Sequence, residues 1–166
     1  PCHYFGACSG CQWQHIDYDV QLELKRMAII NVLADHPSLR HIPVSHTMPS
    51  PNPWNYRNHA RFSVDKQGFL GFVNKQTRRW VLIDRCMLMS QWINAKLGEL
   101  QGNCDDTTQV SIRHGIHTGR NLVQPKLRNP RVVEESGQPY FEEQLLGHTF
   151  RVGSPSFFQV NTLQAE

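Results

Sequence analysis

The sequence predicts an α+β fold in which a mainly antiparallel sheet is flanked by helices and preceded by a cysteine-rich loop. Three observations support this prediction. Short segments with alternating apolar and polar residues follow one another through tight turns. Two longer segments repeat their apolar residues every three to four positions, and three cysteines fall within the first eleven residues. With 166 residues, 39% of them hydrophobic, the chain is long enough for one packed domain with a small appendage.

The first helix is predicted between Asp17, a suitable cap, and Pro37, which ends the pattern. Its apolar positions are Val20, Leu24, Met27, Ile30 and Leu33. Because these residues share one helical face, we expect the stripe to pack into the core. The following segment, residues 37–53, contains five prolines and predicts an extended connector.

The remaining elements are mostly strands. Residues 60–65, 69–73 and 79–84 predict a three-stranded meander, and residues 109–114 and 121–127 predict a hairpin. A second helix lies between them, with the apolar positions Met89, Trp92, Ile93, Leu97 and Leu100, and ends near Gly102. Residues 132–135, 140–146 and 149–153 predict a strand-rich tail.

The five cysteines indicate a metal site rather than a disulfide framework, because their number is odd and no signal peptide is recognised. Cys8 and Cys11 have the spacing of a metal-binding turn, and Cys2 adds a third sulfur. Cys86, expected at the end of a strand, is the candidate fourth ligand, whereas Cys104 lies in a polar loop and is left out. Four thiolates fit either zinc or an iron–sulfur cluster, and the spacing leaves both open. Apart from this site, the N-terminal segment is expected to have little to hold it in place.

Basic and aromatic residues alternate in "YRNHARF" and "TRRW", a mixture suited to phosphates and unpaired bases. The candidate basic face consists of Arg57, Arg61, Arg78, Arg79, Lys126, Arg128 and Arg131. The formal net charge of +3 favours an acidic partner only weakly, and a solvated sheet surface is the alternative. Near the C-terminal end, "SPSFFQVN" combines two phenylalanines, one of them expected in the core, with Gln159, a carboxamide able to read a base edge.

Several classes of protein find no support in the sequence. It contains no apolar stretch long enough to span a membrane, no phosphate-binding glycine loop and no Ser/His/acid signature. We therefore expect a monomeric, cytoplasmic protein that has no membrane partner.

These motifs together resemble the cluster-containing RNA (uracil-5-)-methyltransferases that act on 23S ribosomal RNA. The resemblance rests on "CHYFGACSGCQWQH", "QLELKRMAII", "YRNHARF", "GFVNKQTRRWVLIDRC" and "FFQVN", which occur in the family's order. It implies that Cys2, Cys8, Cys11 and Cys86 bind a [4Fe–4S] cluster. It also implies that Gln159 belongs to the site of S-adenosylmethionine and the target uracil, with Phe157 near the flipped base.

The resemblance further implies three regions: residues 1–16 as the iron–sulfur cysteine loop, 17–153 as a central α+β RNA-binding domain, and 154–166 as the start of a Rossmann-like methyltransferase domain. The family's nucleophilic cysteine, carboxylate base and glycine-rich cofactor loop are not recognised in these 166 residues. We therefore expect the chain itself to be inactive, with ribosomal RNA as its partner. Two alternatives remain open: a ferredoxin-like electron-transfer protein and a zinc-stabilised RNA-binding module.

Overall fold

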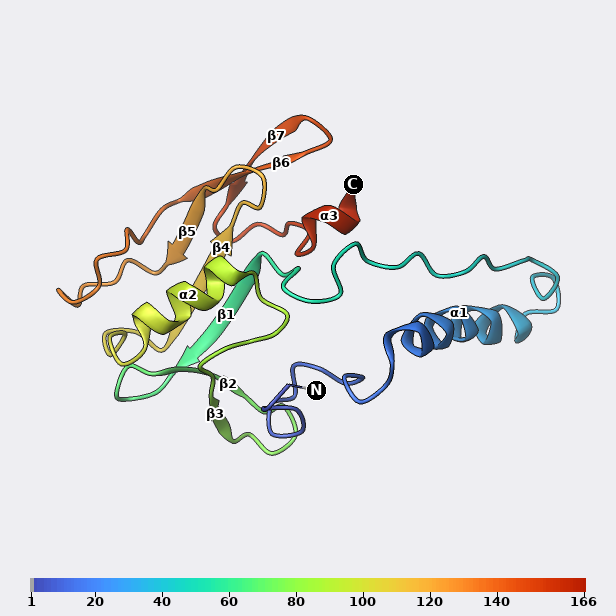
Figure 1. Ribbon diagram of the computed structural model, residues 1–166, viewed down its shortest axis with the longest axis horizontal. Coiled ribbons are helices and arrows are strands. Elements are labelled where there is room, and N and C mark those ends of the chain that lie inside the picture. Colours follow the sequence, from blue (N-terminus) through green and yellow to red (C-terminus); the bar gives the residue numbers. More distant parts are fainter. Residues whose placement is uncertain (1) are drawn as a thin grey trace.

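The computed structural model describes residues 2–166 and confirms the α+β class (Figure 1). A five-stranded antiparallel sheet has the strand order β3-β2-β1-β4-β5, and a separate two-stranded sheet is formed by β6 and β7. The strands are β1 (His59–Val64), β2 (Leu70–Val73), β3 (Trp80–Leu82), β4 (Gln109–His114), β5 (Asn121–Gln124), β6 (Tyr140–Leu145) and β7 (His148–Gly153). The helices are α1 (Tyr18–Ala34), α2 (Gln91–Leu100) and α3 (Thr162–Ala165).

The predicted meander and hairpin are both present, and they join through the central pair of strands. β1 pairs antiparallel with β2 on one side and with β4 on the other, although about 50 residues separate β1 from β4 in the sequence. Phe62 lies opposite Val110 in this pair, and both side chains are fully buried. Their neighbours Arg61 and Ser111 lie on the opposite face, because successive residues of a strand alternate between faces.

The core lies between one face of the five-stranded sheet and α2. The helix contributes Ile93, Leu97 and Leu100, and all three side chains are buried. Ser90 caps the helix, since its side chain accepts a hydrogen bond from the Ile93 amide over 3.2 Å. A smaller apolar cluster under the β6–β7 hairpin is formed by Leu122, Phe141 and Val152, with Phe158 packed against it.

The first predicted helix forms, but the expectation that its stripe enters the core is wrong. No residue of α1 is buried, and Val20, Leu24 and Met27 are 50%, 41% and 41% exposed. Figure 1 shows α1 standing apart from the sheets, with the proline-rich connector running beside it. At the start of α1 the Gln21 side chain donates to the Trp13 and Ile16 carbonyls. Hydrogen bonds also join α1 to the connector: Thr47 donates to the Leu22 carbonyl, Arg26 to the Val44 carbonyl, and the Ser50 amide to the Tyr18 hydroxyl. We call residues 18–50, helix and connector together, the arm.

One predicted strand is also wrong. Residues 132–135, "VVEE", form no strand but part of the loop between β5 and β6. Val132 packs against the core, whereas Val133 is 97% exposed. The β-branched residues suggested a strand, but a strand needs a neighbour to pair with, and the described residues offer none at this place. None of the helices in residues 2–166 is both long and apolar enough to cross a membrane.

Candidate metal centre and nucleic-acid interface

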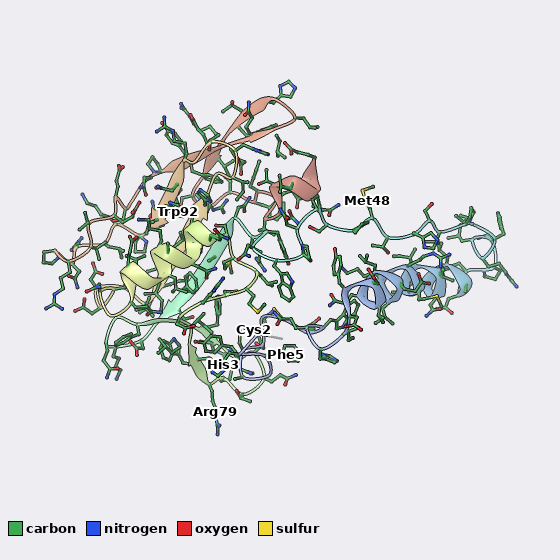
Figure 2. The ribbon with its side chains drawn as sticks, viewed as in Figure 1. Cys2, His3, Phe5, Met48, Arg79 and Trp92 are labelled. Atoms are coloured by element: carbon green, nitrogen blue, oxygen red, sulfur yellow. The ribbon has the colours of Figure 1, made fainter. Side chains whose placement is uncertain are left out.

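The four predicted cysteines border a single cavity of about 210 Å³, which we call the cysteine cavity. Cys2, Cys8 and Cys11 come from the N-terminal loop, and Cys86 comes from the loop between β3 and α2. Figure 2 shows Cys2, His3 and Phe5 of the N-terminal loop beside β2 and β3. Within residues 2–166, no group of three or more His, Cys, Asp or Glu side chains is arranged to hold a metal ion. The thiols therefore border a cavity without closing around one point.

The N-terminal loop is held in place by the sheet, contrary to the expectation that little fixes it. The Tyr4 hydroxyl donates to Asp84 Oδ1 over 2.7 Å, and the Asn74 side chain donates to the Ala7 carbonyl over 2.8 Å. Ser9 adds a third tie, because its Oγ accepts from the Lys75 amide. Tyr4 and Cys8 also pack against the main core. The loop is therefore attached to the β2–β3 turn and to the residues after β3 without any bound group.

Cys86 is fixed in place by α2. It does not end a strand, as the sequence suggested, but lies four residues beyond β3. The Asn94 side chain accepts from the Cys86 amide over 2.8 Å and donates to the Cys86 carbonyl over 2.9 Å. This two-way contact sets the direction of the backbone at Cys86, and so the side of the cavity from which its thiol enters.

The chemistry of the cavity suits an anionic group bound through sulfur. Burial raises the pKa of the Cys8 and Cys11 thiols, and the neighbouring cysteines raise it further, so these thiols need a cationic centre beside them to bind as thiolates. Arg57 and Arg85 also line the cavity. The Nε of Arg57 is buried and has no acceptor among the described residues, an arrangement that costs free energy unless a partner arrives. Four thiols and an unpaired guanidinium donor fit the donor set of an iron–sulfur cluster.

Cys104 is part of the core and not of this cavity. Its side chain is fully buried, and its thiol donates to the Leu100 carbonyl over 3.6 Å. Burial, together with Asp106 and Asp105, raises the pKa of Cys104 to about 12. Such a thiol stays protonated and is a poor ligand, in agreement with leaving it out of the predicted set.

The outer face of the sheet, opposite α2, carries a second cavity of about 650 Å³, which we call the sheet-face groove. Its floor is built from cross-strand neighbours. Arg61 of β1 lies opposite Ser111 of β4, which in turn lies opposite Gln124 of β5. His59 lies opposite Arg113 one step along. His59 and Arg61 line both cavities, so the groove and the cysteine cavity adjoin across β1.

Residues 154–158 and Val160 form the wall of the groove, whereas Gln159 does not line it. Phe157 is 83% exposed, whereas Phe158 packs edge-on against Phe141, with 6.4 Å between the ring centroids. This confirms that one of the two phenylalanines belongs to the core. Gln159 is exposed, and its carbonyl accepts from the Asn58 side chain over 3.0 Å.

Asn58 joins this segment to the centre of the fold. Its side chain also donates to Thr162 over 2.9 Å, and Thr162 donates to the fully buried carboxylate of Glu143 over 2.9 Å. Glu143 further accepts from the amides of Ile116 and His117. The exposed residues Phe157 and Gln159 are therefore presented by a backbone that a buried network holds.

The predicted basic face is divided between different parts of the molecule. Arg57 and Arg61 line the cysteine cavity, as described above. Arg128 and Arg131 line another hollow together with Asp105 and Asp106. Figure 2 shows Arg79 extending away from the molecule at the β2–β3 turn. Of the seven predicted basic residues, Arg57 and Arg61 therefore border the thiols, and Arg61 also lines the sheet-face groove.

Sequence reasoning missed His59, Arg113 and the polar ladder of β4 and β5. His59 has a pKa lowered to about 4 by burial, and the nearby Arg113, Arg57 and Arg61 lower it further, so its ring is neutral. Its Nε2 lies 3.0 Å from Ser111 Oγ. The alternation of polar with buried residues in 109–114 was the available signal, since every second residue there faces the groove.

Comparisons with known proteins agree with this architecture. No family model matches the sequence. A protein of Staphylococcus aureus (strain COL), named as an uncharacterized RNA methyltransferase, is 23% identical over 221 aligned positions that cover 100% of this chain and 49% of the relative. A protein of the same description from Staphylococcus epidermidis (strain ATCC 35984) is 22% identical and is covered to 48%. The chain thus spans about half the length of the curated relatives it matches.

Among solved structures, the tRNA (uracil-54, C5)-methyltransferase of Pyrococcus abyssi in complex with S-adenosyl-L-homocysteine is similar, with a TM-score of 0.74 and 22% sequence identity. The similarity covers 95% of this chain and 48% of that structure. It therefore includes nearly every element described above. The chain is thus similar in sequence to proteins named as RNA methyltransferases, and it shares its fold with part of a tRNA uracil-5-methyltransferase.

Proposed function

We propose that this chain is the RNA-holding part of an S-adenosylmethionine-dependent methyltransferase that forms 5-methyluridine in 23S ribosomal RNA. In this proposal residues 1–16 hold a [4Fe–4S] cluster, residues 17–153 grip RNA, and residues 154–166 lead into a methyltransferase domain. The single observation that carries it is the convergence of four cysteines, three N-terminal and one distant in the sequence, on a cavity next to a cationic sheet face.

The cluster would be held by Cys2, Cys8, Cys11 and Cys86. A polynuclear cluster places inorganic atoms between the thiolates, so it suits ligands that border a cavity, whereas a zinc ion needs all four sulfurs about 2.3 Å from one point. Arg57, with its unpaired buried Nε, would offset part of the negative charge of the bound group. When bound, the cluster would supply a rigid link between the N-terminal loop and Cys86.

RNA would be held by residues of both cavities. Arg57 and Arg61 are suited to phosphates, because guanidinium groups bind phosphate oxygens in a bidentate manner. Phe157, exposed at the wall of the groove, would stack on a base, and Gln159 would contact the target uracil and the methyl donor. Flipping a base out of its stack costs a few kcal/mol, which these contacts would offset.

The reaction itself is tested in cells. Deleting the gene that encodes this chain should remove one 5-methyluridine from 23S ribosomal RNA, measured by mass spectrometry of RNA fragments. The 5-methyluridine of transfer RNA should be unaffected. Loss of the transfer RNA modification alone would instead assign the substrate class of the Pyrococcus abyssi enzyme. The purified 166-residue chain, incubated with labelled S-adenosylmethionine and ribosomal RNA, should transfer no methyl group.

The metal is tested by anaerobic purification and analysis of iron, sulfide and zinc. Iron and sulfide in equal amounts are expected, and the variant Cys86→Ser should lose most of both. Cys104→Ala is the matched control, because Cys104 is a thiol of the core outside the cavity. Zinc without sulfide would favour a zinc-stabilised RNA-binding module. Fast, reversible reduction by a partner protein would favour electron transfer.

A further inference from the structure

The sheet-face groove holds polar groups that no step of the proposed reaction requires. Gln109, Ser111 and Gln124 line it in adjacent positions of β4 and β5, and none of the described residues that line it is Asp or Glu. Ser63 of β1 lies opposite Gln109, and Arg61 lies opposite Ser111. The register of β1 with β4 therefore places neutral hydrogen-bonding groups beside a cation on one continuous surface.

These groups differ in what they offer a ligand. The side-chain Nε2 of Gln124 donates to the backbone carbonyl of Gln138 over 2.6 Å. This bond fixes the Gln124 side chain and leaves its Oε1 as an acceptor. The Gln109 side chain has no hydrogen-bond partner among the described residues, so its donors and its acceptor are both available. Ser111 is oriented by the neutral ring of His59 over 3.0 Å. A surface that only gripped phosphates would need none of these neutral groups.

We propose that the sheet-face groove binds an unpaired RNA strand and that Gln109 and Ser111 read its bases, an inference that rests on the RNA-binding role proposed above. A carboxamide presents a donor and an acceptor side by side, the pattern that matches a base edge in two hydrogen bonds. Arg61, shared by the two cavities, holds the strand's phosphates as it passes towards the cysteine cavity. Phe157 closes the groove on the other side as a stacking surface.

The shape of the site favours a single strand over a duplex. A cavity of about 650 Å³ lies within the range of roughly 300–1,000 Å³ that encloses small organic ligands, so it takes one or two splayed bases. The edges of paired bases lie within the grooves of a duplex and are reached by elements that protrude into them. Here the reading groups lie on the floor of a recess, which only unstacked bases can enter.

The test is equilibrium binding of the chain to short labelled RNA strands of each base and to a hairpin of the same length. The wild-type chain should bind the best unpaired strand about tenfold more tightly than the worst one, and the hairpin no better than the worst. Gln109→Leu and Ser111→Ala should bring the discrimination between strands below about twofold. Their affinity for the worst strand should stay unchanged.

Two further variants separate base reading from charge. Arg61→Gln should weaken binding of all strands equally and reduce the slope of log affinity against log salt by about 0.7. Arg40→Gln, an exposed arginine of the arm, is the control of equal charge and should change neither quantity.

The outcomes distinguish this inference from the proposal on which it rests. Unchanged discrimination in both Gln109→Leu and Ser111→Ala, or equal affinity for hairpin and strand, would overturn the groove as a base-reading site. RNA binding that still depends on Arg57 would then leave the wider RNA-binding role standing. If the wild-type chain binds no RNA at all, both are overturned.

Discussion

The arm and the body, by which we mean the two sheets together with α2 and α3, each contain a helix with apolar residues three to four positions apart, but the two helices pack very differently. Leu24 in α1 and Leu97 in α2 both lie on apolar helical stripes, yet Leu24 is 41% exposed and Leu97 is fully buried. α2 lies against the five-stranded sheet, whereas α1 stands apart from both sheets beside the extended connector (Figure 1). Periodicity therefore shows that a helix has an apolar face, but not what that face meets.

The two regions also differ in how they are tied to the rest of the chain. In the body, the buried network of Asn58, Thr162 and Glu143 links the start of β1 to α3 and β6. The arm is joined near its base, where the Asn161 side chain donates to Ser50 Oγ and the Gln21 side chain donates to the Trp13 and Ile16 carbonyls. A few hydrogen bonds at partly buried positions contribute much less stability than a core, so we expect the arm to open at a lower free energy.

The largest expected effect tests this contrast with matched substitutions. Leu97→Ala should lower the free energy of unfolding by about 2–5 kcal/mol, because it leaves a cavity in the core. Leu24→Ala should change it by about 0.5 kcal/mol or less, because the side chain is already in contact with water and alanine favours the helix. Urea denaturation followed by circular dichroism measures both. Equal losses in the two variants would show that the arm is packed in solution.

The second prediction concerns the network that presents Phe157 and Gln159. Asn58→Ala removes two donated hydrogen bonds at a buried position and should cost about 1–3 kcal/mol. The residues after Gln159 should also exchange their amide hydrogens faster. The amides of α2 should exchange faster only by the amount that the loss of global stability accounts for. Thr47→Ala is the counterpart in the arm, where one hydrogen bond to the Leu22 carbonyl is lost. If Thr47→Ala lowers the free energy of unfolding as much as Asn58→Ala does, burial does not explain the difference between the arm and the body.

The elements of the body could be predicted because their patterns report local geometry. Alternation in residues 60–65 and 109–114 follows directly from a strand with one buried face. The segment 132–135 shows the limit of the same reasoning, since composition alone does not supply a pairing partner. The arm shows a second limit, because the covering of a helical face depends on residues far away in the sequence.

The candidate site also has a part that local sequence patterns predict and a part that they do not. The spacing of Cys8 and Cys11 is a local signal, and the structure brings Cys2 and Cys86 to the same cavity. The sheet-face groove could not be predicted, because it depends on the register that sets Arg61 opposite Ser111. That register is fixed by the burial of Phe62 and Val110 on the other face, because a slip of β1 by one residue would turn Phe62 outward.

The third prediction uses pH to probe the body. The folded-state pKa of His59 is about 4, below the ordinary histidine value of about 6.5. Between these values the unfolded chain binds a proton that the folded chain does not, so the free energy of unfolding should fall as the pH decreases from about 6.5 to about 4. His114, whose pKa burial also lowers, should add to this loss. His59→Gln should flatten the dependence measured by urea denaturation, and an unaltered slope would contradict the assignment.

The smallest expected effect lies in the N-terminal loop, which is intermediate between arm and body. Tyr4→Phe removes the hydroxyl that donates to Asp84 Oδ1 and accepts from the Asp84 amide. Because this pair is exposed, the free energy of unfolding should change by only about 0.5–1 kcal/mol. Hydrogen exchange of the Cys8 amide, which is bonded to the Tyr4 carbonyl over 2.7 Å, should nevertheless become several-fold faster. If exchange at Cys8 is unchanged, Asn74 and the core contacts of Cys8 suffice to hold the loop, and the loop then behaves as part of the body.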